Sequence, residues 1–399
     1  MKRSLSIILL LAMLLCLAAC GETAPAATAA PEATQTPDDS PEAMAAEAER
    51  LFYDDADYAA AFEKLSVAEI SGFAEVQELL GTCYYLGLGT DVDYDEAVPL
   101  LTRAADQGSV PAMYMLAAAN YAGNGARKDT DKAGELYRKF VSAAESAGIE
   151  ETDRYGRVLA YLADCYGFGR GVTKNADKAN DYAEKAVAAG KLCALDQVRL
   201  AEGYVAGVFG KAEPTPDPEP TGDPYAVPDS AVNTEEPAAE VKTVPAEAEA
   251  LYSSALSGIR ALADCGNVKA VKILGDYSFY GLGGVGQDYL KALEYYTEAG
   301  EQGDADAQAQ VGYIYQNACG VEADYEKAME WNNRAAQQGN AQGQAHIGWL
   351  YHHGLGVTQN LDEAGRWYTR AADQGNTWAE ERLAETEITN PQSSFEAHA

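Results

Sequence analysis

A repeat of roughly 36 residues constrains the fold of this chain more than any other feature. Successive units close on a glycine, and the closing glycines are 36, 40, 42, 76, 37, 36 and 36 residues apart: Gly72, Gly108, Gly148, Gly190, Gly266, Gly303, Gly339 and Gly375. The interval of 76 contains a proline-rich insertion and is therefore one long unit. Because one such unit cannot close a hydrophobic core, neighbouring units must stack.

The first half of each aligned unit predicts a helix that ends at a glycine turn. Positions are counted from an apolar residue, which is position 0. A small residue follows at position 1, a residue that is mostly tyrosine stands at position 4, and glycines stand at positions 7 and 9. In the unit that begins at Leu80 these residues are Gly81, Tyr84, Gly87 and Gly89. Positions 0, 4 and 7 share one helix face. The glycines then break the helix, since they adopt left-handed backbone at no steric cost.

The second half of each unit predicts another helix, which is marked by an alanine. Four residues before it stands an Asp or Asn in every unit but one: Asp93, Asp129, Asn175, Asp288, Asp324 and Asn360. These residue types are natural N-caps, each contributing about 1 kcal/mol. The pattern therefore predicts an all-α fold, an α/α superhelical solenoid of about seven helix-turn-helix units. A half unit over 57–72 is expected before them and a closing helix over 378–387 after them.

The columns resemble those of the Sel-like repeat family, which is related to the tetratricopeptide repeats. Its pattern of A-x-x-x-L-G-x-x-Y-x-x-G-x-G-V, followed by D-x-x-K-A-x-x-W-Y-x-x-A-A-x-x-G, is matched best over 309–339 and 344–375. The resemblance implies a solenoid that binds proteins. A cysteine-rich secreted branch of the family carries regular disulfides, but this chain lacks that cysteine spacing, so we expect Cys83, Cys165, Cys193, Cys265 and Cys319 to be mainly structural and unpaired.

The first twenty residues are typical of a secretory signal. Lys2 and Arg3 precede an apolar run over 7–19, and the sequence then reads Leu-Ala-Ala-Cys up to Cys20. This ending resembles the bacterial lipobox, which implies that Cys20 is lipidated and that residues 1–19 are removed. The alternative is an ordinary signal with a chance cysteine. On the lipoprotein interpretation the chain is anchored in the cell membrane and faces away from the cytoplasm.

Two low-complexity segments divide the rest of the chain. We expect a tether over 20–42, a first solenoid segment over 43–210, a second over 250–388, and a tail over 389–399. The Pro- and acid-rich insertion over 211–249 is predicted to be extended, because alternate prolines block helix formation. It is interpreted either as a solvated loop, whose replacement would leave the fold intact, or as a docking peptide.

Charge and motif content exclude several functions. A formal net charge of −33 opposes binding to nucleic acid, because the phosphate backbone requires a cationic surface. No serine-hydrolase, zinc-protease or phosphate-loop motif occurs, so we expect no catalysis and no cofactor. His346, His352 and His353 cluster in the last unit, and the choice there lies between a metal site and ordinary helix-end imidazoles.

One face of each first helix varies freely and is the predicted binding surface. Positions −2, +2 and +5 lie opposite positions 0, 4 and 7, at about 160°, 200° and 140° for a turn of about 100° per residue. The resemblance to tetratricopeptide repeats implies that this face lines a concave groove. The candidate binding residues are Tyr85, Tyr121, Asp276, Phe279, Tyr313, Trp349 and His352. The alternative is that their aromatic rings pack between adjacent first helices.

Two kinds of function fit this sequence. The first is an interaction scaffold that holds a partner protein or peptide on the concave face. The second is a lipoprotein that binds an envelope polymer or a small ligand and assists an enzyme or a transporter.

Overall fold

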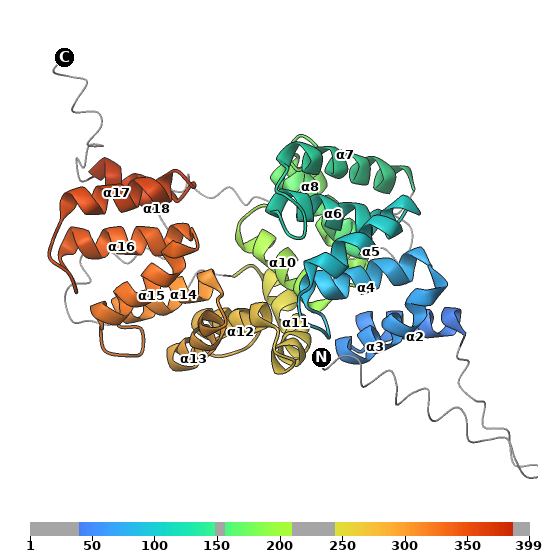
Figure 1. The fold of residues 1–399 in the computed structure, drawn as a ribbon, viewed down its shortest axis with the longest axis horizontal. Helices are drawn as coiled ribbons and strands as arrows, with labels where there is room; N and C mark the ends of the chain where they lie inside the picture. The colour runs from blue at the N-terminus through green and yellow to red at the C-terminus, as the bar shows by residue number, and fades with distance from the viewer. Residues whose placement is uncertain (1–39, 148–155, 210–243, 386–399) are drawn as a thin grey trace, which may run out of the picture. The chain divides into compact units, whose positions relative to one another are not determined.

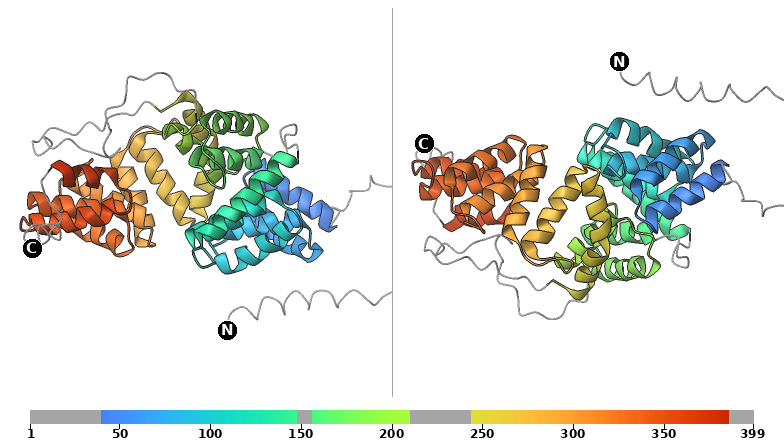
Figure 2. Two further views of the ribbon diagram at one scale, coloured as in Figure 1. Left: turned by 90° about the horizontal axis from the view of Figure 1, so that it is seen from above. Right: turned by 90° about the horizontal axis from the view of Figure 1, so that it is seen from below.

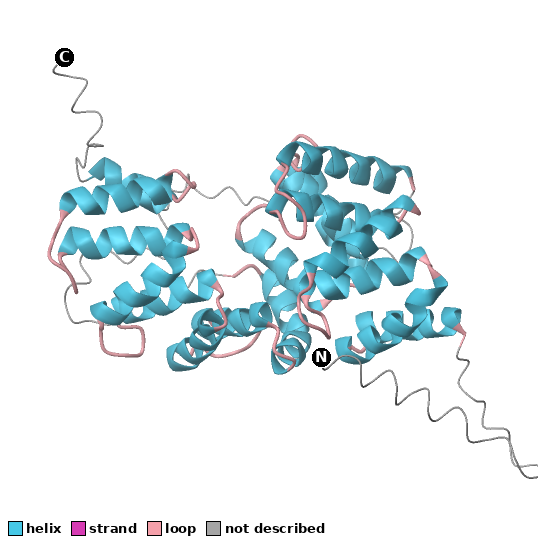
Figure 3. Ribbon diagram, in the orientation of Figure 1, coloured by secondary structure: helices cyan, strands magenta, loops and turns pink. Residues whose placement is uncertain are grey.

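The computed structural model describes residues 40–147, 156–209 and 244–385, and this part of the chain is built from helices and turns without a strand (Figure 3). The predicted all-α fold is confirmed. None of the helices in the described ranges has both the length and the apolar character that a membrane span requires. Cys20, the signal and tether up to residue 39, most of the insertion and the tail lie outside the described residues.

Helices follow one another as antiparallel pairs, each packed on the next (Figures 1 and 2). The N-terminal pair is α2 (Pro41–Tyr53) and α3 (Tyr58–Ala68), followed by the short η1 (Glu69–Ser71). Units 1 to 3 are α4 (Ala74–Leu86) with α5 (Tyr94–Asp106), α6 (Val110–Ala122) with α7 (Thr130–Ser146), and α8 (Gly156–Phe168) with α9 (Ala176–Ala189). Unit 4 pairs α10 (Ala194–Val205) with α11 (Ala246–Asp264). Units 5 to 7 are α12 (Val268–Tyr280) with α13 (Tyr289–Glu301), α14 (Ala305–Gln316) with α15 (Tyr325–Gln337), and α16 (Ala341–His353) with α17 (Leu361–Ala372), and α18 (Thr377–Glu385) follows.

Two predicted boundaries are wrong. The expected half unit is a complete helix pair, because Ser40 caps α2 through the backbone N–H of Ala43. The predicted insertion extends to residue 249, but α11 already begins at Ala246. Glu249 binds unit 5 from this first turn, since its carboxylate accepts hydrogen bonds from the backbone N–H groups of Gly283 (3.1 Å) and Gly284 (2.8 Å).

The predicted caps and helix breaks are confirmed. Each predicted Asp or Asn accepts a hydrogen bond from a backbone N–H in the first turn of its second helix, as Asp288 does from Lys291 at 3.0 Å. The glycines at position 7 have positive φ, such as 72° at Gly281 and 66° at Gly354. Ala318 stands in the same column with φ of 55°, so an L-residue occupies left-handed backbone there.

Replacing Ala318 by glycine should therefore stabilise the protein. Left-handed backbone costs an L-residue about 1–2 kcal/mol, and glycine recovers this while losing about 0.5–1 kcal/mol of additional chain entropy on folding. We expect Ala318→Gly to raise the free energy of unfolding in urea by about 0.5–1 kcal/mol. The reverse change Gly354→Ala is the control and should lower it, because its new Cβ would also lie 2.9 Å from Gln359. Equal free energies of unfolding for Ala318→Gly and Gly354→Ala would contradict the conclusion that Ala318 occupies strained left-handed backbone.

The small residue at position 1 lets the two helices of a unit approach closely. A Cβ on Gly275 would lie 2.6 Å from the Tyr296 ring, and one on Gly348 would lie 2.8 Å from the Tyr368 ring. Both distances are too short for real contacts, so the ring of the second helix fills the space that the missing side chain leaves.

First helices line the inner side of the solenoid. They contact one another from unit to unit, as in α4 with α6, α6 with α8, α8 with α10, and α14 with α16. Within the described ranges, no two second helices of adjacent units make contact as extensive. Since the elements that pack closest together lie on the shorter arc, we call the surface formed by the first helices the inner face.

Candidate functional site

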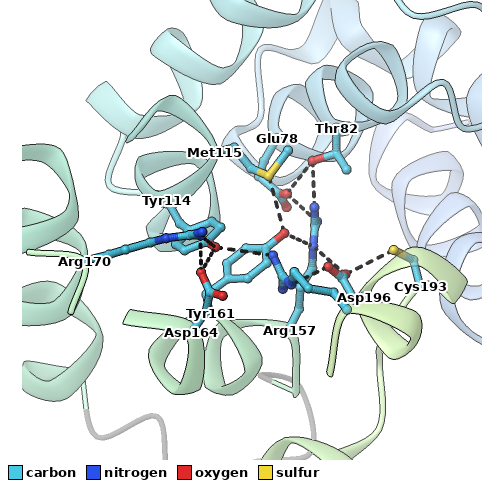
Figure 4. A network of polar contacts seen from close by, with 11 residues as sticks. Glu78, Thr82, Tyr114, Met115, Arg157, Tyr161, Asp164, Arg170, Cys193 and Asp196 are labelled. Carbon is cyan, nitrogen blue, oxygen red and sulfur yellow. Dashed lines mark hydrogen bonds and ion pairs between the residues drawn. The ribbon is translucent and has the colours of Figure 1, made fainter. Parts of the chain in front are cut away.

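The inner face of units 1 to 4 is filled by a buried polar network centred on Arg157 of α8 (Figure 4). The Arg157 side chain is 3% exposed. Its Nη1 donates to Glu78 Oε1 at 2.7 Å, and its Nη2 donates to Thr82 Oγ1 at 3.0 Å, both in α4. Its Nε lies 3.2 Å from Asp196 Oδ2 of α10. One guanidinium therefore joins units 1, 3 and 4.

A second part of the network surrounds Tyr114 of α6. Its hydroxyl donates to Asp164 of α8, which is also paired with Arg170. The Tyr114 ring stacks on the Tyr161 ring with centroids 3.9 Å apart. The Arg199 guanidinium of α10 lies over the Tyr161 ring at 4.6 Å and also pairs with Asp196 at 3.3 Å.

The network balances its charges. Its three guanidinium groups, Arg157, Arg170 and Arg199, face the three carboxylates Glu78, Asp164 and Asp196. Burial alone would lower the pKa of Arg157, but Tyr161, Glu78 and Asp196 raise it well above its usual value. Burial raises the pKa of Glu78, against the opposing effect of Arg157. Glu78, Arg157, Asp164 and Asp196 are buried, whereas Arg170 and Arg199 are 32% and 31% exposed at the edge of the network. Because these groups are paired with each other, the network holds four first helices together.

Charged side chains lie exposed or half-buried on the inner face where unit 4 meets unit 5. Glu202 of α10 is exposed, yet the protein around it raises the pKa of its carboxyl, against the opposing effects of Lys272 and Lys269 of α12. Lys272 Nζ pairs with Asp276 Oδ2 at 2.8 Å, and Asp276 also accepts a hydrogen bond from Tyr296 at 2.9 Å. We call Glu202, Lys269, Lys272 and Asp276 the open stretch.

Aromatic rings continue the inner face through units 5 to 7. The Phe279 and Tyr313 rings lie 6.0 Å apart, the Tyr313 and His346 rings 5.6 Å apart, and the His346 and Trp378 rings 6.1 Å apart. These four residues come from α12, α14, α16 and α18 in turn, and all are buried. Burial lowers the pKa of His346 to about 4.

The predicted binding residues do not form one surface. Phe279 and Tyr313 are 2% and 8% exposed, so they belong to the core and the expectation of an open groove at these positions is wrong. The reason is that each ring packs against the next first helix. Asp276 lies in the open stretch. Tyr121 is exposed on α6 under the Arg170 guanidinium, whereas Tyr85, Trp349 and His352 are half-buried.

Some of these residues do lie together. Tyr85 accepts a hydrogen bond from Asn124 at 3.3 Å, close to the turn that follows Tyr121. Trp349 and His352 both contact the His353 ring, with centroids 4.3 and 4.7 Å apart. The metal alternative is not supported within the described ranges, because no three His, Cys, Asp or Glu side chains there form a group that could hold an ion. The five cysteines there are free thiols, and all but Cys265 are buried.

The sequence did not identify the buried network. The only available signal was a charged residue inside an otherwise apolar first helix, as with Arg157 and Asp164 in α8. That signal could not show that both charges point inward, because exposed charges occur on first helices as well.

Similarity to known proteins agrees with this architecture. Six segments match the Sel1 repeat, residues 74–109, 110–143, 157–191, 269–304, 305–340 and 341–376, which together cover more than half of the chain. No curated protein sequence matches the chain.

Several solved structures are similar. One is c5321, a protective antigen present in uropathogenic Escherichia coli strains and displaying an SLR fold, at 25% identity and a TM-score of 0.34 over 86% of this chain and 64% of that one. This chain thus spans less than two thirds of the length of that protein. A Sel1 repeat protein from Oxalobacter formigenes is 23% identical, with a TM-score of 0.37 over 87% of both chains. Immunity protein Pa5087 from Pseudomonas aeruginosa is 19% identical, with a TM-score of 0.34 over 67% of this chain and 82% of that one.

Proposed function

This chain belongs to the Sel1 repeat family, whose members generally bind other proteins, and on that premise we propose that it holds a segment of a partner protein on the open stretch of its inner face. The observation that carries this proposal is the position of Glu202. Its side chain is exposed on α10 and interacts electrostatically with Lys272 and Lys269 of α12, so charged groups of both signs meet where unit 4 joins unit 5.

The open stretch suits a protein segment with polar and charged side chains. It offers both charge signs, Lys269 and Lys272 beside Glu202 and Asp276, within two adjacent first helices. Charges arranged in this way fix the register of a partner and select against wrong ones more than they add affinity. The network in units 1 to 4 holds α10 in place, so the site is built on a rigid element.

Site-specific crosslinking tests this function in intact cells. A photoreactive amino acid placed at Glu202 should yield a defined adduct with one partner protein, identified by mass spectrometry. The matched control carries the same amino acid at Glu298, an exposed acid on α13, a second helix. A partner seated on the inner face gives an adduct at Glu202 and none at Glu298. Equal adducts at both positions, or none at Glu202, would contradict the proposal.

We further propose that the protein is a lipoprotein, anchored through Cys20 and facing away from the cytoplasm. The support is the sequence Leu-Ala-Ala-Cys after a charged start and an apolar run. A diacyl anchor contributes about 0.8 kcal/mol for each buried CH₂ group, which is enough for durable attachment.

Replacing the lipidated residue tests the anchor. Cys20→Ala should abolish incorporation of labelled fatty acid, because no thiol remains to be acylated, and should leave the unprocessed precursor intact. Cys265→Ala, which removes an exposed cysteine of the folded part, is the control and should incorporate label normally. Undiminished label in Cys20→Ala would rule out the lipoprotein.

A further inference from the structure

The tyrosine at position 4 of the first helix fills the groove between two successive second helices. Tyr166 shows this best: its hydroxyl donates to Glu145 of α7 at 2.6 Å, and its ring stacks on Tyr182 of α9 with centroids 5.8 Å apart. Lys178 Nζ, also from α9, lies 4.4 Å from the centre of the Tyr166 ring. Tyr84 likewise contacts Phe62 of α3, with centroids 5.2 Å apart. This groove is on the side of the solenoid away from the inner face.

Unit 2 lacks this filling. Asn120 replaces the tyrosine, and its Nδ2 turns back to donate to Leu116 O of its own helix at 2.8 Å. Unit 5 also lacks the tyrosine, having Ser278, but it has Tyr295 in the second-helix column in which Tyr182 stands. Unit 2 has Leu136 in that column and is the one unit without an aromatic residue at either position.

A hollow lies where the ring is missing. It has a volume of about 730 Å³ and lies between α5 and α7, with α6 as its floor. This volume is within the usual range of ligand sites. Val98, Leu116 and Leu136 give it apolar walls, and Asn120 and Lys132 line one end. A second hollow of about 470 Å³ shares Asn120, Ala126 and Lys132 with the first. We call the two together the unit 2 slot.

Lys132 is placed to receive an aromatic ring from outside. It is the third residue after the N-cap Asp129, as Lys178 is after Asn175 and Lys327 is after Asp324. Lys178 and Lys327 each lie over the tyrosine of their own unit, at 4.4 and 4.9 Å from the ring centres. In unit 2 the equivalent lysine faces the slot instead.

The slot is cationic in a strongly acidic protein. Residues 127–139 contain five cations, Arg127, Lys128, Lys132, Arg138 and Lys139, against the three acids Asp129, Asp131 and Glu135, whereas the whole chain has 62 acids and 29 cations. All five cations line one of the two hollows. Two acids also line the hollows, Asp106 and Asp129, and Asp129 is occupied in capping α7. The charge around the slot therefore favours an anionic ligand.

We propose that the unit 2 slot binds an acidic segment of a partner protein through an inserted tyrosine. The ring occupies the apolar space between Leu116 and Leu136 and lies under Lys132, and the flanking carboxylates face Arg127, Lys128 and Lys139. Aromatic anchors in desolvated pockets carry most of the energy of such contacts, while charge steers the approach. This site is on the opposite side of the solenoid from the open stretch, so the two proposals stand or fall separately.

Fluorescence anisotropy with a labelled synthetic peptide tests the site on the folded protein. The peptide carries one tyrosine flanked by aspartates and glutamates. We expect saturable binding that weakens at high salt. A peptide with alanine in place of the tyrosine should bind at least tenfold more weakly, and so should one with lysines in place of the acids. Equal binding of the tyrosine and alanine peptides would overturn the proposal.

Refilling the slot is the decisive variant. Asn120→Tyr restores the ring found in other units, and Leu136→Trp supplies the tryptophan that units 6 and 7 have at Trp331 and Trp367. Each should weaken peptide binding at least tenfold without lowering the melting temperature, and two independent fillings guard against a folding defect in one. Ala122→Tyr, which adds the same ring at an exposed position of α6, is the control and should bind normally. Normal binding by the folded filled variants would overturn the proposal.

Discussion

Arg157→Met should lower the free energy of unfolding by about 3–5 kcal/mol, since removal of one member of a buried ion network leaves its partners uncompensated. Arg157 is the cation that pairs with Glu78, whose side chain is 8% exposed, and the variant leaves this carboxylate buried without that partner. Asp196 loses one partner but keeps Arg199. Chemical denaturation followed by far-UV circular dichroism measures the loss.

The control and a rescue variant separate charge from size. Arg260→Met changes an exposed arginine of α11 and should alter stability by less than about 0.5 kcal/mol. The double variant Arg157→Met with Glu78→Gln should recover part of the loss, because the buried charge is gone and the amide can still bond Thr82. If Arg157→Met lowers the free energy of unfolding no more than Arg260→Met does, water reaches the network and the network does not hold the first helices together.

Acidification should destabilise the protein through His346 well before the imidazole of the folded state is protonated. Burial lowers the pKa of His346 to about 4. Above the usual histidine pKa of about 6.5, both the folded and the unfolded states are neutral at this residue and it has no effect. As pH falls below that value, His346 becomes protonated in the unfolded state but stays neutral in the folded state. The free energy of unfolding therefore decreases progressively down to about pH 4. At about 1.4 kcal/mol per pKa unit, the total loss approaches about 3 kcal/mol.

The comparison with His346→Phe isolates this residue from the many carboxylates. Phenylalanine keeps the ring contacts with Tyr313 and Trp378 and cannot titrate. Between pH 7.5 and pH 4.5, the free energy of unfolding of the wild type should fall by about 2–3 kcal/mol more than that of His346→Phe. His353→Phe is the matched control, because it makes the same substitution at a half-buried histidine. Parallel pH profiles for wild type and His346→Phe would show that the imidazole is hydrated or paired.

The sequence was sufficient for whatever depends on local backbone chemistry. Helix pairs, the Asp and Asn caps and the glycine turns follow from short spacings, and the structure confirms them at Asp288 and Gly281, for example. The close packing at Gly275 also follows, because a column that is always small must face a neighbour.

The content of the inner face could not be predicted, because it depends on how far each unit rotates relative to the last. Position +2 holds Asp164 inside the network, Glu202 in the open stretch and Tyr313 in the core, although all three have the same sequence register. The exceptions in the tyrosine column were visible in the sequence, but only the hollow beside Asn120 gives that exception a meaning.

The reach of the Arg157 network also has an evolutionary consequence. It ties residue 78 to residue 157 and residue 157 to residue 196, so it spans units that are not consecutive. Loss or duplication of a single unit among the first four would separate these partners and leave charges stranded. Unit 5 is also tied to unit 1, because Asn267 Nδ2 at the start of α12 donates to Leu86 O and Gly87 O at 2.9 and 2.8 Å. Units 6 and 7 pack in smaller core clusters, which require only a compatible adjoining unit. These long-range contacts constrain the number of units up to unit 5, so we expect relatives of different length to differ mainly after unit 5.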